Sequence, residues 1–257
     1  ILSIIWCALA TSCSSSAKYM LSSNTCATSS TSVNNPKKDM KHLSVKKIAT
    51  SVARAEDVPA LLDAQGVEFQ PINCVDWAAD YPYAPKVEFR IAHKGDAVLI
   101  EYRVSEQSVA AVAPHDNGRV WEDSCCEFFF QPEGGNVYYN VETTCAGTVL
   151  VGCGETREAR EAAPAEVLNA ISRWSSLGRT PFAERIEPTT WHMALIIPTG
   201  TAFHSQIATL DGARMKANFY KCGDKLQTPH FLSWNRIDLP SPNFHRPDFF
   251  GPLEFER

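Results

Sequence analysis

The sequence has no apolar run as long as the roughly 18 residues that a transmembrane helix requires, so no membrane-spanning helix is expected. It also has no surplus of positive charge, because 24 Lys and Arg residues stand against 29 Asp and Glu residues, for a net charge of −5. No basic stripe offsets this balance, and general nucleic-acid binding is therefore not expected. Glycine-rich nucleotide loops, nucleophile elbows, HExxH helices and EF-hand loops are absent as well. The chemistry that those motifs carry is not predicted for this chain.

The nine cysteines include no CxxC pair and no Cys/His cluster with the spacing of a zinc site. Because nine is an odd number, at least one cysteine has no partner within the chain. Disulfide-rich scaffolds are also much shorter than 257 residues. Most of the cysteines lie in strand-like segments, where a free thiol behaves as a small buried hydrophobe. We therefore expect reduced, buried thiols.

Residues 1–39 differ in composition from the rest of the chain. They begin with ILSIIWCALATSC, a short apolar run that is similar to the tail of a bacterial lipoprotein signal but has no basic segment before it. The segment that follows is rich in Ser, Thr and Asn, which favours disorder. Either translation begins at Met40 and the protein is cytoplasmic, or the segment is a genuine leader and the protein is a periplasmic or outer-membrane lipoprotein. Under both hypotheses, residues 40–257 form the folded domain.

The centre of the sequence, residues 121–147, predicts two β-strands joined by a turn. Residues 121–130 and 137–144 are rich in aromatic and β-branched side chains, and Gln-Pro-Glu-Gly-Gly-Asn between them is typical of a hairpin loop. Side chains alternate between the two faces of a strand. We expect an apolar face that pairs Phe130 with Val137, Phe128 with Tyr139 and Cys126 with Val141. The other face then pairs Glu127 with Asn140 and Cys125 with Glu142, in line with Trp121 and Asp123. This acidic face with a tryptophan at its end is where we expect a binding site.

Other short segments of the chain also have strand character. They lie at residues 43–50, 67–75, 87–93, 97–105, 191–198 and 215–221, with the first expected at a sheet edge. Helical propensity is confined to residues 57–63 and 156–170. Short strands separated by turns predict an all-β fold, an antiparallel β-sandwich of the jelly-roll type with a short helical insertion.

Four segments together resemble a known family. They are WEDSCCEFF from Trp121, YNVE at 139–142, WHMALIIP at 191–198 and the run rich in Phe, Trp and His at 216–251. The set is similar to the family-9-like carbohydrate-binding modules of the stand-alone bacterial type, within the DOMON-like group of β-sandwiches. The resemblance covers the chain from about residue 43 to its C-terminus.

The resemblance implies non-catalytic binding of a mono- or oligosaccharide, in support of the breakdown of polysaccharides or glycans. In that family a sugar is held between two tryptophans, polar side chains bond its hydroxyls, and structural calcium is common. The implied ligand-binding residues are Trp121, Glu127, Asn140, Glu142, Trp234 and Asn235, with Trp121 and Trp234 as the two rings. Glu142 stands where the family places a basic residue. A pyranose has an apolar face that suits an indole and hydroxyls that need polar partners, so these residue types fit a sugar.

Other interpretations remain open at the level of sequence, as does the oligomeric state. Glu127 and Glu142 would be diagonal neighbours, roughly 5–8 Å apart, which overlaps the separation of the two carboxyl groups in glycoside hydrolases. Alternatively, Glu127 forms an ion pair with Arg103 or Arg119. A metal- or haem-binding DOMON-like domain would use His230, His245 and Asp248, or a histidine with Met193 or Met215. Trp77 and Trp191 are expected in the core.

Overall fold

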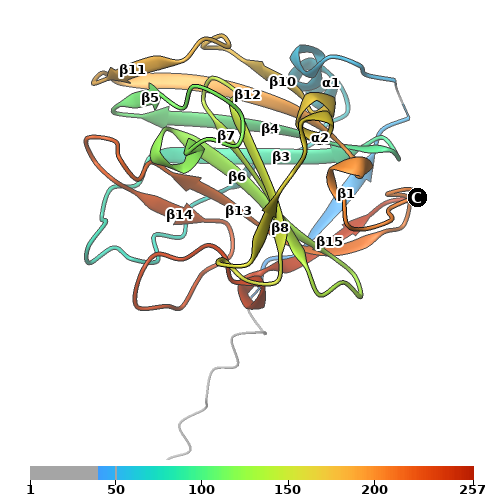
Figure 1. Cartoon of the computed structure of the whole chain (residues 1–257). Coiled ribbons are helices and arrows are strands. Elements are labelled where there is room, and N and C mark those ends of the chain that lie inside the picture. The colour runs from blue at the N-terminus through green and yellow to red at the C-terminus, as the bar shows by residue number, and fades with distance from the viewer. Residues whose placement is uncertain (1–39, 50) are drawn as a thin grey trace, which may run out of the picture. The chain divides into compact units, whose positions relative to one another are not determined.

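The computed structural model describes residues 40–49 and 51–257 (Figure 1), so the hypotheses about residues 1–39 lie outside the described part of the chain. That part consists mainly of β-strands, with short α-helices at α1 (Val58–Ala64) and α2 (Ala165–Ala170). The predicted all-β sandwich is therefore confirmed. Within the described residues, no helix is long and apolar enough to cross a membrane.

The sandwich is built from two halves of one large sheet. The first half contains β2 (Gln70–Pro71), β3 (Lys86–His93), β4 (Ala97–Glu106), β10 (Ser172–Ser175) and β12 (Thr189–Pro198). The second half contains β6 (Cys125–Pro132), β7 (Tyr138–Thr144), β8 (Val149–Gly154), β9 (Arg160–Ala162), β13 (Arg214–Cys222), β14 (Phe231–Ser233) and β15 (Gly251–Phe255). β1 (Leu43–Lys47) joins the halves, because it pairs in parallel with both β3 and β15. A separate two-stranded sheet pairs β5 (Val109–Ala111) with β11 (Phe182–Arg185).

The main hydrophobic core lies between the two halves, where β6, β7 and β13 cross β3 and β4 (Figure 1). Phe89 of β3 stacks on Phe219 of β13 with their ring centroids 3.7 Å apart. Trp191 of β12 is buried in this core, and Trp77 is buried in a second cluster on the outer side of the second half. Both tryptophans are therefore core residues, as predicted.

Two predictions about local structure are wrong in part. The sequence predicts an edge strand at 43–50, but β1 lies inside the sheet between β3 and β15. The segment at 156–170 was expected to be helical, yet only α2 is helical and β9 pairs with β8. Its alanine and charged residues favour a helix, but pairing with β8 overrides that weak local preference.

The hairpin of β6 and β7 forms, but its register differs by two residues from the predicted one. Phe130 pairs with Tyr139, because β6 continues to Pro132 and β7 begins only at Tyr138. A shift of two residues leaves each side chain on its predicted face. The shift places Glu127 directly opposite Glu142, where the sequence predicted a diagonal arrangement.

Candidate functional site

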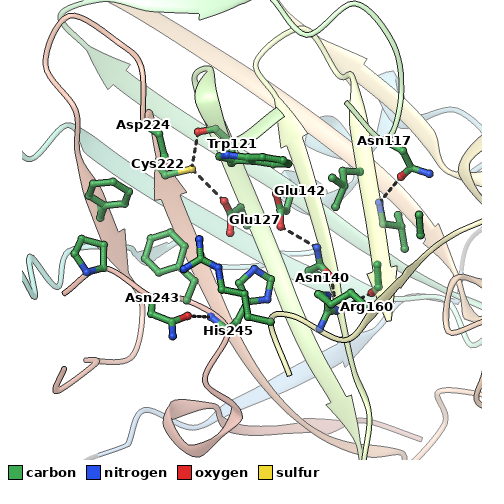
Figure 2. A pocket seen from close by; sticks show the side chains of 18 of the residues that line it. Asn117, Trp121, Glu127, Asn140, Glu142, Arg160, Cys222, Asp224, Asn243 and His245 are labelled. Carbon is green, nitrogen blue, oxygen red and sulfur yellow. Dashed lines mark hydrogen bonds between the residues drawn. The ribbon is translucent and has the colours of Figure 1, made fainter. Parts of the chain in front are cut away.

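A cavity of about 350 Å³ lies on the outer face of the second half-sheet, opposite the main core (Figure 2). β6, β7, β8 and β13 contribute its floor, while residues 157–162 and 242–245 contribute its sides. The lining includes Trp121, Glu127, Asn140, Glu142, Arg157, Arg160, Cys222, Asp224, Phe231, Phe244 and His245. Four of the six residues that the sequence indicated are thus brought together here, namely Trp121, Glu127, Asn140 and Glu142.

Trp121 lies at one end of the cavity, in the 3₁₀ turn η3 (Val120–Glu122) that precedes β6. Its side chain is half-buried, and Figure 2 shows the indole beside the carboxyl groups of Glu127 and Glu142. The backbone N–H of Asp224 donates a hydrogen bond of 3.2 Å to the carbonyl oxygen of Trp121. This bond ties η3 to the turn after β13, and it fixes the position of the indole against the cavity floor.

Glu127 and Glu142 are buried side by side on the floor, with only 2% and 4% of their surfaces exposed. Burial raises the pKa of Glu127 well above its usual range, and the neighbouring Glu142 raises it further. Burial also raises the pKa of Glu142 to about 7, although a hydrogen bond from Asn140 opposes that shift. In the same way, burial raises the pKa of Asp224 to about 6. The carboxyl groups of Glu127, Glu142 and Asp224 therefore hold their protons more tightly than ordinary surface carboxyl groups do.

No Lys or Arg side chain of the described chain forms an ion pair with Glu127. Of the two partners that the sequence suggested, Arg103 contacts Glu101 at 3.2 Å and Arg119 contacts Glu122 at 3.0 Å. Burial without an ion pair is costly for a carboxylate, which is why the protonated form is favoured. The ion-pair interpretation of Glu127 is wrong.

Arg160 of β9 is the functional candidate that the sequence did not indicate. Its guanidinium group donates to the carbonyl oxygens of Tyr138 at 3.1 Å and Gly152 at 3.0 Å, and to the side-chain oxygen of Asn140. Asn140 in turn donates to Glu142 at 2.8 Å. A basic side chain therefore reaches Asn140 from β9, which is separated from β7 by β8. Sequence reasoning misses Arg160 because the propensity of residues 156–170 predicts a helix, which gives no indication that this segment pairs with β8.

Two residues that line the cavity each have a buried side-chain polar atom without a hydrogen-bond partner among the described residues. One is the Oε2 oxygen of Glu142, an acceptor when the group is ionised, and the other is the Nε–H of Arg160, a donor. Buried polar groups in folded proteins are nearly always paired. A donor and an acceptor left without partners in the same cavity indicate a ligand that can both donate and accept.

Aromatic side chains of the C-terminal tail form the opposite side of the cavity. Phe231 and Phe244 line it, and His245 accepts or donates a 3.0 Å hydrogen bond with the hydroxyl of Tyr138. Burial lowers the pKa of His245 to about 3, assisted by the positive charges of Arg160 and Arg157, so the imidazole is neutral at physiological pH. The side chain acts as a flat, uncharged wall.

The structure separates Trp234 and Asn235 from the cavity. Side chains of β14 alternate, so Phe231 faces the cavity while Trp234, three residues on, faces the main core with 1% of its surface exposed. Its ring contacts Phe219 edge-on at 5.6 Å. The side-chain oxygen of Asn235 accepts a 2.7 Å hydrogen bond from the backbone N–H of Lys41, away from the cavity. Neither residue belongs to the site that the other four form.

The residues suggested for a metal or haem site do not assemble. His230 contacts Lys221 at 2.7 Å, and Asp248 pairs with Arg246 at 2.6 Å on the surface. Met193 and Met215 are buried in the main core. Among the described residues, the one group of at least three His, Cys, Asp or Glu side chains with converging ligand atoms is Cys125, Glu127 and Cys222. Calcium prefers six to eight oxygen ligands, so a group with two thiols does not fit the calcium that the resemblance implied.

Comparison with known proteins gives a consistent result. The model of carbohydrate-binding family 9 matches residues 56–255. A crystal structure described as "a putative carbohydrate-binding protein" from Bacteroides uniformis ATCC 8492 is 54% identical, covers 84% of this chain and 99% of that chain, and superposes with a TM-score of 0.82. A family 9 carbohydrate-binding module from Caldicellulosiruptor kristjanssonii in complex with cellotriose is 11% identical, covers 84% and 94% of the two chains, and has a TM-score of 0.52, a likeness of fold alone. No curated protein matches the chain.

Proposed function

The chain belongs to carbohydrate-binding family 9, and we propose that it binds a mono- or oligosaccharide, without cleaving it, in the cavity beside Trp121. The half-buried indole offers a flat apolar surface to the C–H face of a pyranose ring. Polar groups of Glu142 and Asn140 on the floor, and of Arg160 at the side, are placed to meet the hydroxyls. A binding module of this kind would hold a polysaccharide or glycan for enzymes that degrade it.

The pair of unpartnered atoms on Glu142 and Arg160 carries this proposal. A sugar hydroxyl is a donor and an acceptor at once, so it can donate to Glu142 Oε2 and accept from Arg160 Nε. Leaving either buried atom without a partner costs roughly 1–3 kcal/mol, and a ligand that satisfies both recovers that cost. An apolar ligand would leave both atoms unpaired.

The ring opposite Trp121 comes from the tail and not from Trp234. Phe231, Phe244 and His245 all line the cavity, whereas Trp234 lies in the core. Since stacking on a sugar requires only a flat apolar face, a phenyl ring or a neutral imidazole suits this side.

Sugar cleavage is the weaker alternative. A glycoside hydrolase needs one carboxyl group that is protonated and a second that is ionised. In this cavity burial raises the pKa of both Glu127 and Glu142, and no described Lys or Arg side chain forms an ion pair with either carboxyl group to keep it ionised. Glu127 and Glu142 therefore suit hydrogen bonding to a bound sugar better than they suit hydrolysis.

Calorimetric titration of the full chain with glucose, cellotriose and a panel of other mono- and oligosaccharides tests the proposal. The same mixtures are assayed for released reducing ends. We expect heat of binding for at least one sugar and no release. Release that disappears in the Glu127→Gln variant would favour the hydrolase, and a folded protein that binds no sugar in the panel would contradict the proposed site.

A further inference from the structure

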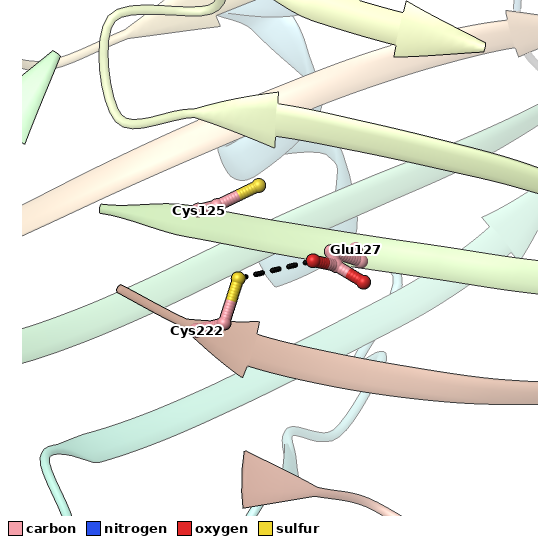
Figure 3. Close-up of side chains that lie close together, drawn as sticks. All are labelled: Cys125, Glu127 and Cys222. Atoms are coloured by element: carbon pink, nitrogen blue, oxygen red, sulfur yellow. Dashed lines mark hydrogen bonds between the residues drawn. The ribbon is translucent and has the colours of Figure 1, made fainter. Parts of the chain in front are cut away.

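Two thiols and a carboxyl group converge where the cavity floor meets β13 (Figure 3). Cys125 and Glu127 lie two residues apart on β6 and share one face, and Cys222 of β13 pairs directly with Cys125. The ligand atoms of the three side chains all lie within 4.8 Å of one another, and Cys222 Sγ is 3.1 Å from Glu127 Oε1. Adjacent strands hold the three residues, so their backbones are fixed relative to one another.

This geometry is close to that of a tetrahedral zinc site. Bonds of about 2.3 Å to sulfur and about 2.0 Å to oxygen place neighbouring ligand atoms roughly 3.5–3.8 Å apart. Small side-chain rotations are enough to bring atoms that already lie within 4.8 Å to those separations. Thiolate ligands select zinc and similar soft or borderline cations over calcium and magnesium.

Acidic groups surround the cluster, and no ion pair with Lys or Arg is formed there within the described chain, although Arg157 and Arg160 line the same cavity. Glu142 lies opposite Glu127, and Asp224 follows two residues after Cys222. None of the described Lys or Arg side chains forms an ion pair with Glu127, Glu142 or Asp224. Lys221, which adjoins Cys222, points into the main core and pairs with Glu106, and Lys225, which adjoins Asp224, pairs with Glu122. A divalent cation would therefore meet carboxyl oxygens that no described Lys or Arg side chain occupies.

We propose that Cys125, Glu127 and Cys222 bind a thiophilic divalent metal ion, Zn²⁺ being the best match, at the floor of this cavity. Binding releases the protons of the two thiols and of the Glu127 carboxyl group to solvent, and it leaves two thiolates and one carboxylate as ligands. Cys222 lines the cavity, which provides a path for the ion and leaves a position for water or another oxygen ligand. The unpartnered Oε2 of Glu142 is available to accept a hydrogen bond from that ligand.

The other cysteines of the second half-sheet provide a comparison for the cluster. Cys126 and Cys153 point to the opposite face and lie in the main hydrophobic core. Cys125 and Cys222 belong to the second apolar cluster, on the other face of the sheet, and there they lie beside Glu127, with Cys222 lining the cavity. Cys126 is next to Cys125 on the same strand and equally buried, so it provides a matched control.

Titration of the metal-free full chain with Co²⁺, in the presence of a non-thiol reductant and without any sugar, tests the site. Thiolate ligation produces a sulfur-to-cobalt charge-transfer band that increases to one equivalent and is bleached by Zn²⁺. We expect this band in the wild type and in Cys126→Ser, and its loss in Cys125→Ser and Cys222→Ser. In Glu127→Gln we expect the affinity for cobalt to fall at least tenfold, by analogy with the loss of a supporting ligand.

Thermal unfolding of the same proteins in chelator and in excess Zn²⁺ separates metal binding from folding. We expect zinc to raise the Tm of the wild type and of Cys126→Ser, but not that of Cys125→Ser or Cys222→Ser. The absence of a charge-transfer band in the folded wild type would overturn the proposal, as would an undiminished band in Cys222→Ser. Because no sugar is present, these outcomes are independent of whether the cavity binds carbohydrate.

Discussion

Lys221 and Glu106, whose side chains are fully buried, form an ion pair of 2.9 Å between the two halves of the sandwich. The lysine Nζ also lies 2.7 Å from Nε2 of His230, and the other oxygen of Glu106 accepts a 2.7 Å hydrogen bond from the indole of Trp191. Burial and the charge of Lys221 lower the pKa of His230 to about 2, so its neutral Nε2 accepts from the ammonium group. The network joins β4, β12 and β13 within an otherwise apolar core.

Removing one member of this ion pair is predicted to destabilise the fold strongly. Lys221→Met leaves the Glu106 carboxylate buried without a counterion, and we expect a loss of about 3–5 kcal/mol in the free energy of unfolding. In the double variant Lys221→Met/Glu106→Gln the buried charge is gone while Gln still accepts from Trp191, so part of the loss should be recovered. Urea unfolding of the three proteins measures this, and a double variant less stable than Lys221→Met would contradict it.

Substitution of Trp121 is predicted to weaken sugar binding, whereas substitution of Trp234 is predicted to lower the stability of the fold. Trp121→Ala removes the flat surface of the cavity, and we expect sugar affinity to fall at least tenfold. A tenfold loss corresponds to about 1.4 kcal/mol of binding free energy. We expect little change in the free energy of unfolding. Trp234→Phe acts in the core and also removes an indole N–H that has no partner among the described residues. It should cost roughly 1–2 kcal/mol of stability and leave affinity unchanged. Calorimetry combined with urea unfolding distinguishes the two, and equal effects on affinity would contradict the assignment.

The outcome for these tryptophans shows what the sequence can and cannot establish. The alternation of side chains along β6 and β7 predicts that Glu127 and Glu142 lie on the polar face. The structure confirms this, because the observed register differs from the predicted one by two residues and such a shift leaves each side chain on the same face. Trp234 was placed by its resemblance to a family motif, without a strand register to say which way it faces. Because β14 pairs with β13, the side chain turns into the core.

Long-range pairing explains what the sequence could not predict. Arg160 approaches Asn140 only because β9 adds to the edge of β8, and nothing local to residues 156–170 indicates that pairing. The cluster of Cys125 and Cys222 likewise depends on β6 lying beside β13, which are far apart in the sequence. Spacing rules for metal sites detect ligands that are close in sequence and therefore miss this arrangement.

Stability is predicted to change with pH through Glu142. Burial raises its pKa in the folded state to about 7 from an ordinary value of 4.5, so the folded protein holds this proton more tightly than the unfolded chain does. The resulting stabilisation is fully present below pH 4.5 and is lost as the pH rises to about 7. Relative to Glu142→Gln, which does not titrate, the wild type should lose on the order of 2–3 kcal/mol across that range.

Urea unfolding in the presence of a chelator, at several values between pH 4.5 and 8, measures the difference between wild type and Glu142→Gln. Comparing the two proteins at each pH matters because burial lowers the pKa of His230 and His245, and these histidines destabilise the fold as the pH falls. Their contributions cancel in the difference. A difference that stays constant with pH would contradict the raised pKa of Glu142.

A methyl group added at Gly152, which lines the cavity, is predicted to disturb sugar binding by displacing Asn140 and Arg160. A Cβ atom at this position of β8 would lie 2.8 Å from the side-chain oxygen of Asn140 and 3.2 Å from Nε of Arg160, which is too close for both. In Gly152→Ala these side chains must move, and the hydrogen bonds that hold Arg160 and Glu142 in position are lost. We expect affinity for the sugar to fall roughly tenfold, or about 1.4 kcal/mol, with the fold retained.

Gly200→Ala, whose added methyl group meets no atom within 4 Å, is the matched control and should bind as the wild type does. Unchanged affinity in Gly152→Ala would show that the Asn140–Arg160 arrangement does not position the ligand.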